Sequence, residues 1–203
     1  PWAPRLPAFQ KDPAPVLALL ELLKDDPALY VRRSVANNLN DIGKDHPEVL
    51  TRTTHQWLQG ASEERQWIVR HALRTAIKRG EPGALAVLGF GTQADVAVRG
   101  AQITPSRAAI GEKVVLAFEV VNRSAASQRV LVDFRIHYTK ANGSTAAKVF
   151  KLKTLELQAG ETARLQKTVS LAQMSTRTHY PGRHRVDALL NGHAEPLGHF
   201  DLR

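Results

Sequence analysis

The feature that most constrains the fold is a change of hydrophobic period near the middle of the 203-residue chain. Up to Gly91, apolar residues recur every three or four positions, which is the period of an amphipathic helix. Beyond residues 89–92, apolar and polar residues alternate, most clearly over residues 130–138, which is the period of a half-buried strand. We therefore expect two domains, a helical domain over residues 1–91 and a β domain over residues 92–203.

Helix-start signals divide the first domain into short helices. A Pro directly follows Asp12, Asp26 and His46, and Pro is favoured in the first turn of a helix. Ser62 precedes two glutamates, which suits an N-cap and the positive end of the helix dipole. We expect a helix to begin at each of these four points.

The helical domain also contains an internal repeat. The pair Val31-Arg32 recurs 38 residues later as Val69-Arg70, and the apolar positions that follow recur with the same offset. This spacing is close to that of two-helix solenoid repeats such as HEAT. The sequence therefore predicts a HEAT-like α-solenoid.

The second domain is predicted to be an antiparallel sandwich. Turn signals such as Asn142-Gly143 and Asn191-Gly192 separate its strand-like runs. The runs cover residues 114–121, 130–138, 149–157, 163–171, 184–190 and 197–202. About seven short strands in roughly 110 residues are typical of an immunoglobulin-like β-sandwich. The chain has no Cys, so its core alone must hold such a domain together.

Residues 30–47 carry the most informative helix. Wound at about 100° per residue, they place apolar side chains on one side and cations, amides and a carboxylate on the other. The polar side carries Arg33, Asn37, Asp41 and Lys44, with Asn40 beside them. Cations and amides bind phosphates and base edges, so the pattern favours a nucleic-acid partner. A solvated outer face, or an asparagine ladder between neighbouring repeats, would give the same pattern.

Further cations extend this side of the helical domain. Arg70 and Arg74 lie on the corresponding helix of the second repeat, and with Arg32 they are expected to neutralise phosphates. The chain carries a net charge of +9, and residues 92–203 hold 16 Lys and Arg against 9 Asp and Glu. That excess favours a sandwich that lies on DNA.

A loop-like segment in the sandwich, residues 175–185, carries Arg177 and Arg183 beside a Pro-Gly turn. The segment is either an ordinary hairpin or an arm that reaches into a DNA groove beside a lesion. Under the second interpretation, both arginines contact DNA.

Asp41 is the candidate for chemistry. A carboxylate that faces a sugar can stabilise a developing oxocarbenium ion or position a water for attack at C1′. Trp2 is the second candidate, because the face of a Trp ring attracts a cation such as a methylated base by roughly 0.5–2 kcal/mol. The alternatives are structural: Asp41 would form a helix ion pair worth about 0.3–0.5 kcal/mol, and Trp2 would fill an apolar gap.

Several classes of function lack a signal. Without Cys the chain has no thiolate chemistry, and its composition fits a reducing cytoplasm. No apolar run reaches the roughly 18 residues of a membrane span, and no signal peptide opens the chain. The histidines show no ligand spacing, so no metal site is predicted. Because no initiator Met is present, we expect a fragment of a longer protein.

The helical half contains the segments PWAPRLPAF, DPALYVRRSVANNLNDIGKDHPEVL and ERQWIVRHALRTAIKRG. They resemble the C-terminal repeats of the AlkC-type DNA alkylation repair glycosylases. The segment HYPGRHRVDALLNG is similar to the immunoglobulin-like domain that some members carry. The resemblance implies a HEAT-like solenoid related to AlkD, with no metal or organic cofactor. It also implies hydrolysis of the N-glycosidic bond of cationic N-methylated bases such as 3-methyladenine, which leaves an abasic site.

The same resemblance assigns residues and a partner. By motif position, Asp41 would be the family's carboxylate and Trp2 its aromatic ring, and double-stranded DNA with alkylated bases would be the partner of a monomeric protein. The family is longer, and its earlier repeats, which contribute further acidic site residues, are absent here. The alternative function is a non-enzymatic HEAT plus immunoglobulin-like module that binds another protein.

Overall fold

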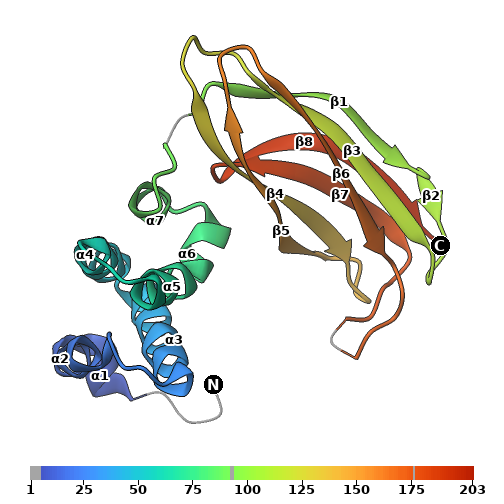
Figure 1. Cartoon of the computed structure of the whole chain (residues 1–203). Coiled ribbons are helices and arrows are strands. Elements are labelled where there is room, and N and C mark those ends of the chain that lie inside the picture. Colours follow the sequence, from blue (N-terminus) through green and yellow to red (C-terminus); the bar gives the residue numbers. More distant parts are fainter. Residues whose placement is uncertain (1–5, 92–93, 176) are drawn as a thin grey trace. The chain divides into compact units, whose positions relative to one another are not determined.

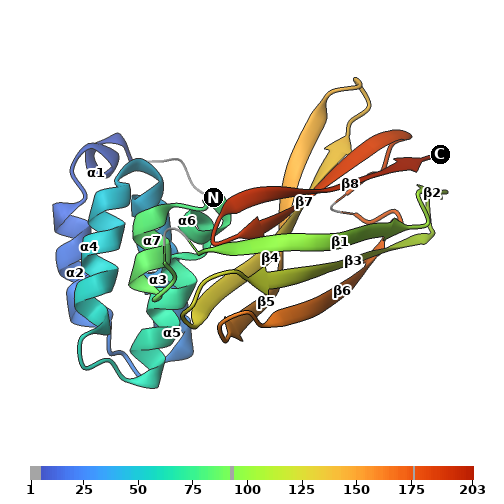
Figure 2. The same cartoon turned by 90° about the horizontal axis from the view of Figure 1, so that it is seen from above.

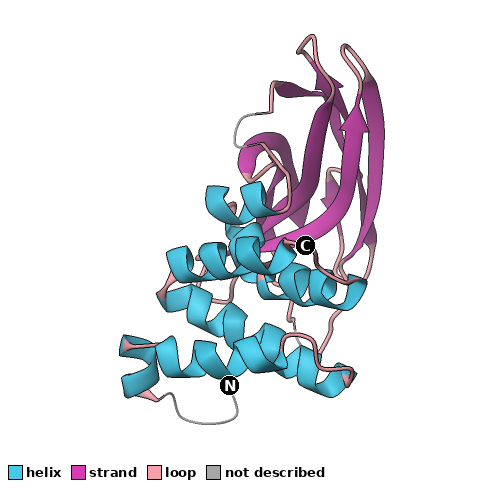
Figure 3. Ribbon diagram, turned by 60° about the vertical axis from the view of Figure 1, so that its left-hand side comes forward, coloured by secondary structure: helices cyan, strands magenta, loops and turns pink. Residues whose placement is uncertain are grey.

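The computed structural model describes residues 6–91, 94–175 and 177–203. The chain forms two compact units, of which the first ends at Gly89 and the second begins at Phe90. The described residues form seven helices in the first unit and eight strands in the second (Figure 1), and Figure 3 shows the same division by secondary structure. This confirms the predicted fold class, a helical region followed by an immunoglobulin-like β-sandwich.

The described helices are α1 (Pro7–Lys11), α2 (Ala14–Leu23), α3 (Leu29–Asp45), α4 (Pro47–Leu58), α5 (Glu63–Ala72), α6 (Arg74–Arg79) and α7 (Pro82–Val87). Four of the helices, α2 to α5, begin within three residues of the four predicted signals, and the short helices α1, α6 and α7 were not predicted. Ser62 Oγ accepts a hydrogen bond from the Arg65 amide at 3.2 Å, and Asp26 Oδ1 accepts one from the Ala28 amide at 2.8 Å. Side-chain acceptors thus satisfy amides that the helix itself leaves unpaired. None of the described helices has both the length and the apolar composition needed to cross a lipid bilayer.

The internal repeat corresponds to helices that lie side by side in the first unit. α3 packs against α4, α5 and α6, and α4 packs against α7 (Figure 2). The repeated positions Val35, Leu39, Leu73 and Ile77 are all buried. The two copies differ in one respect, because α3 runs unbroken for 17 residues whereas the second copy is interrupted at Leu73, between α5 and α6.

The second unit is a sandwich of two sheets. Its strands are β1 (Val96–Thr104), β2 (Arg107–Ala108), β3 (Lys113–Asn122), β4 (Gln128–Thr139), β5 (Thr145–Leu157), β6 (Thr162–Ser170), β7 (Gly182–Leu190) and β8 (His193–Leu202). One sheet has the order β1-β3-β6 and the other β2-β8-β7-β4-β5. Neighbouring strands are antiparallel, except for the short parallel pair of β2 and β8.

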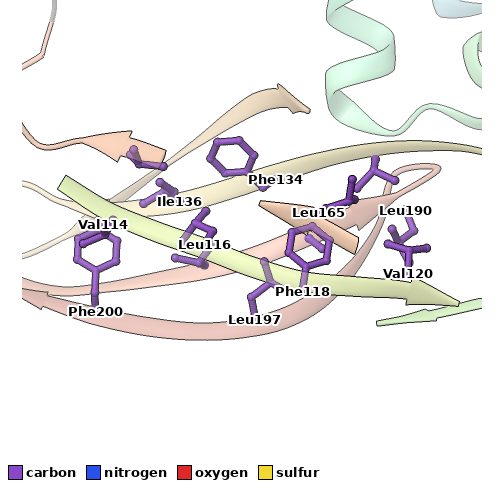
Figure 4. Close-up of a cluster of buried hydrophobic side chains, with 14 of the residues drawn as sticks. Val114, Leu116, Phe118, Val120, Phe134, Ile136, Leu165, Leu190, Leu197 and Phe200 are labelled. Carbon is purple, nitrogen blue, oxygen red and sulfur yellow. The ribbon is translucent and has the colours of Figure 1, made fainter. Parts of the chain in front are cut away.

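The core of the sandwich is made of alternate side chains from both sheets. Leu116 and Phe118 on β3 are buried, as are Phe134 and Ile136 on β4 (Figure 4). The strand period of two therefore reflects one buried face per strand.

Asn122 links the two sheets. Its side chain is buried at the end of β3, and Nδ2 donates to the carbonyl oxygens of Leu157 at 3.0 Å and of Gln158 and Ala126 at 2.8 Å. Since β3 belongs to the three-stranded sheet and Leu157 ends β5 of the five-stranded sheet, one amide group connects both sheets.

Candidate nucleic-acid interface

The exposed side of α3 carries the predicted polar residues. Arg33, Asn37, Asp41 and Lys44 are all exposed, and the first three follow one another at intervals of one helical turn. Lys44 Nζ lies 2.5 Å from Asp41 Oδ1. The helix thus presents a carboxylate, an amide and two cations to solvent.

Arg74 adds a further cation to this surface from α6. Its Nη2 donates to Asn37 Oδ1 at 2.9 Å and its Nη1 to the carbonyl oxygen of His71 at 2.6 Å. Burial lowers the pKa of Arg74, and the nearby charge of Asp41 partly opposes that effect. We refer to Asn37, Asp41, Lys44 and Arg74 as the Asp41 cluster.

Arg32 and Arg70 lie next to this surface but make different contacts. Arg32 Nη1 donates to the carbonyl oxygen of Pro27 at 2.7 Å, which ties the side chain to the connection before α3. Arg70 is exposed, and its Nη1 lies 3.4 Å from Gln66 Oε1 on the same helix. Arg70 is therefore open to a ligand, whereas Arg32 is engaged by the backbone.

One predicted residue does not join the cluster. Asn40 was expected beside the polar stripe, but it is 3 % exposed and lies on the buried side of α3. The reason is helical geometry: Asn40 follows Ala36, which is fully buried, by one turn. Trp2 lies outside the described residues.

The two sandwich arginines make different contacts. Arg177 places its guanidinium 4.9 Å from the ring centre of Tyr138 and 5.3 Å from that of Phe150, and it donates to Tyr138 Oη at 3.2 Å. Arg183 on β7 is exposed, with Nε 3.3 Å from Asp201 Oδ1. Arg183 is thus accessible, while Arg177 is packed on aromatic rings.

A second group of charges, missed by sequence analysis, surrounds a buried carboxylate. Asp187 on β7 is 5 % exposed, and its Oδ2 lies 2.7 Å from Arg135 Nη2 and 2.8 Å from His137 Nε2. Arg185 Nε lies 3.5 Å from Asp187 Oδ1. Burial alone would raise the pKa of Asp187, but hydrogen bonds from His137 and Arg135 and the charges of Arg135 and Arg185 bring it below its usual value. We call these four residues the Asp187 cluster.

Two histidines of the sandwich are packed among rings. His179 and His184 are buried, and their ring centres lie 5.4 and 5.6 Å from that of Tyr138. Burial lowers the pKa of both; Arg177 adds to this for His179, and a hydrogen bond with the Gly182 carbonyl opposes it for His184. Across residues 6–91, 94–175 and 177–203, no group of three or more His, Cys, Asp or Glu side chains is arranged to hold a metal ion.

The similarity to known proteins extends over the whole chain. Residues 97–203 match the family described as uncharacterised protein YhaZ, C-terminal Ig-like domain. The uncharacterized protein YhaZ of Bacillus subtilis (strain 168) is 38 % identical over 192 residues, which cover 95 % of this chain and 53 % of that protein.

A solved structure matches as well. The alkylpurine DNA glycosylase AlkC of Pseudomonas fluorescens, bound to DNA that contains an abasic-site analogue, matches with a TM-score of 0.93 and 43 % identity over 100 % of this chain and 56 % of AlkC. The chain therefore spans about half the length of both relatives. The resemblance predicted from the sequence is confirmed: the chain belongs to the YhaZ family, carries its C-terminal immunoglobulin-like domain, and is homologous to AlkC.

Proposed function

We propose that this chain acts in base excision, in which the N-glycosidic bond of a cationic N-methylated base such as 3-methyladenine is hydrolysed in duplex DNA to leave an abasic site. The observation that carries the proposal is the Asp41 cluster, an exposed carboxylate restrained by Lys44 at 2.5 Å in a chain 43 % identical to AlkC. The proposal needs no metal, because a base that is already cationic is a good leaving group.

The chemistry required of the protein is mainly electrostatic. As the glycosidic bond breaks, positive charge develops on the sugar, and a fixed carboxylate stabilises it. Lys44 limits the rotation of the Asp41 side chain and so keeps the carboxylate in one place. In the same proposal, Trp2 supplies an aromatic face to the cationic base.

Exposed cations would hold the DNA backbone. On the helical unit these are Arg33, Arg70 and Lys44, and on the sandwich Arg183. Each phosphate that they neutralise makes the affinity for DNA fall more steeply with salt. Arg32 and Arg177 are engaged by a backbone carbonyl and by aromatic rings, so we assign them a supporting role in these contact surfaces.

Base release from methylated duplex DNA tests the proposal. Asp41→Asn keeps the shape of the side chain but removes its charge, and we expect base release to fall by about 10²–10³-fold, as for loss of one group that stabilises transition-state charge. Asp45→Asn, an exposed carboxylate on the same helix, is the matched control and should retain activity.

Two results would count against the proposal. Unchanged base release in Asp41→Asn would remove Asp41 from the mechanism. Wild-type binding that hardly responds to salt between about 50 and 200 mM would favour the protein-interaction module, because phosphate contacts are steeply salt-dependent.

A further inference from the structure

Arg74 differs from the neighbouring arginines because it joins the two repeat copies. Its Nη2 donates to Asn37 Oδ1 at 2.9 Å, from α6 to α3, whereas Arg70 donates to its own helix. Arg74 is half-buried and Asn37 is exposed. A half-buried guanidinium that is already bound to protein is poorly placed to neutralise a phosphate, so the role expected for Arg74 from the sequence needs revision.

Arg74 directly follows the interruption of the second repeat copy. The helix stops at Leu73 and resumes at Arg74, whose Nη1 binds the carbonyl oxygen of His71 at 2.6 Å. In the first copy the equivalent position, 38 residues earlier, is Ala36, which is fully buried in the continuous α3. A position that is internal in the first copy therefore carries, in the second copy, a side chain that crosses between the repeats.

The hydrogen bond also fixes the orientation of the Asn37 amide. A guanidinium carries only donors, so the amide atom that faces Arg74 has to be the oxygen. The two N–H groups of Asn37 Nδ2 then point away from Arg74. Asn37 and Asp41 are one turn apart on the exposed side of α3, so the oriented amide and the carboxylate lie on the same surface.

We propose that Arg74 is a positioning residue that holds the Asn37 amide so that its N–H groups bind a backbone oxygen of DNA while Asp41 faces the sugar. This inference rests on the proposed function. Donors then meet the anionic phosphate, and the carboxylate meets the sugar that becomes cationic. If the Asn37 amide rotated freely, its oxygen would face the phosphate in part of the population. The amide oxygen and the phosphate oxygens would then repel each other.

Salt dependence separates this role from that of a phosphate clamp. The full 203-residue chain would be titrated onto a duplex with an abasic-site analogue at several salt concentrations. The proteins compared are the wild type, Arg74→Met, Arg70→Met, Asn37→Leu and the double variant Arg74→Met/Asn37→Leu. Arg70→Met removes an exposed cation and should reduce the slope of log K against log salt by about 0.9. Arg74→Met should weaken binding about tenfold through the lost Asn37 contact, with the slope unchanged.

The double variant tests whether Arg74 acts through Asn37. It should bind no more weakly than Asn37→Leu alone, because both changes remove the same contact. A slope reduced as in Arg70→Met, together with additive losses, would overturn the proposal. Thermal unfolding of each variant verifies that the fold is retained.

A second measurement needs no DNA. The side-chain amide signals of Asn37 in a ¹⁵N–¹H spectrum are identified by their loss in Asn37→Leu. They should shift in Arg74→Met and stay in place in Arg70→Met. Unmoved signals in Arg74→Met would overturn the positioning role, whereas failure of the wild-type chain to bind duplex would refute the proposed function.

Discussion

Two carboxylates of this chain, Asp41 and Asp187, are each surrounded by cations, yet their environments differ. Asp41 lies on an open helix surface with Lys44 at 2.5 Å. Asp187 is 5 % exposed and takes contacts from Arg135, His137 and Arg185. The first carboxylate is accessible to a ligand, and the second is enclosed by protein groups.

The comparison shows that burial, rather than the identity of the neighbours, distinguishes a carboxylate that a ligand can reach from one that protein groups enclose. A buried carboxylate that accepts several charge-assisted hydrogen bonds holds strands β4 and β7 together. The exposed pair of Asp41 and Lys44 contributes little to stability, so the fold does not depend on it and its groups are available to bind a ligand. Substitutions at the two carboxylates should therefore have opposite consequences for folding and for activity.

The largest expected effect on stability is that of Asp187→Asn. Removing this buried charge leaves the half-buried Arg135 without its charged partner, which costs up to about 3–5 kcal/mol. Asp41→Asn should change the free energy of unfolding by less than about 0.5 kcal/mol. Denaturant unfolding of both variants measures the difference, and equal losses would break the distinction between the two clusters.

The next prediction concerns how the stability of the sandwich depends on pH through the buried residue His184. The pKa of His184 in the folded protein lies below its ordinary value of 6.5. Below about pH 6.5 the unfolded chain therefore binds more protons at His184 than the folded protein does. The stability that comes from burying neutral His184 is complete above that pH and is lost as the pH falls. His184→Phe should make the acid-side decline of sandwich stability shallower.

Exposed His199 provides the control for this measurement. His199→Phe removes a histidine from the adjacent strand β8 without touching the buried rings. Denaturant midpoints recorded between about pH 5 and 7.5 compare the two variants. A decline equally steep in His184→Phe and wild type would exclude His184 as its source.

The smallest expected effect on stability is that of Lys44→Met. An exposed helix ion pair is worth about 0.3–0.5 kcal/mol, so the unfolding free energy should change by no more than it does in Asp41→Asn, which breaks the same pair. Base release should nevertheless fall several-fold, because the Asp41 carboxylate loses its restraint. A variant that is strongly destabilised would show that the Asp41 cluster is structural, like the Asp187 cluster.

Much of the fold followed from local pattern. The change of period predicted both halves, and α4 begins at Pro47 as the His46-Pro47 signal indicated. Strand β1 was missed because Arg99 and Gly100 interrupt any alternation, at an irregularity in its pairing with β3. Local pattern therefore fails where the pairing of two strands is irregular.

The candidate site was only partly predictable, because its contacts depend on how helices and strands meet. The polar residues on α3 followed from helical spacing. The bond between Arg74 and Asn37 depends on how α6 packs against α3, which the local sequence pattern does not give. The Asp187 cluster depends on the register of β4 with β7, in which Arg135 lies opposite Asp187.

The buried amide of Asn122 has a consequence for how the sandwich responds to its surroundings. Sandwiches of this kind in antibody domains are closed by a covalent sulfur bridge between sheets, whereas here the Asn122 amide of one sheet donates a hydrogen bond to the Leu157 carbonyl oxygen of the other. Assembly of this unit therefore requires no oxidant and no isomerase for sulfur pairing. Reductants such as dithiothreitol should leave its unfolding midpoint where it was.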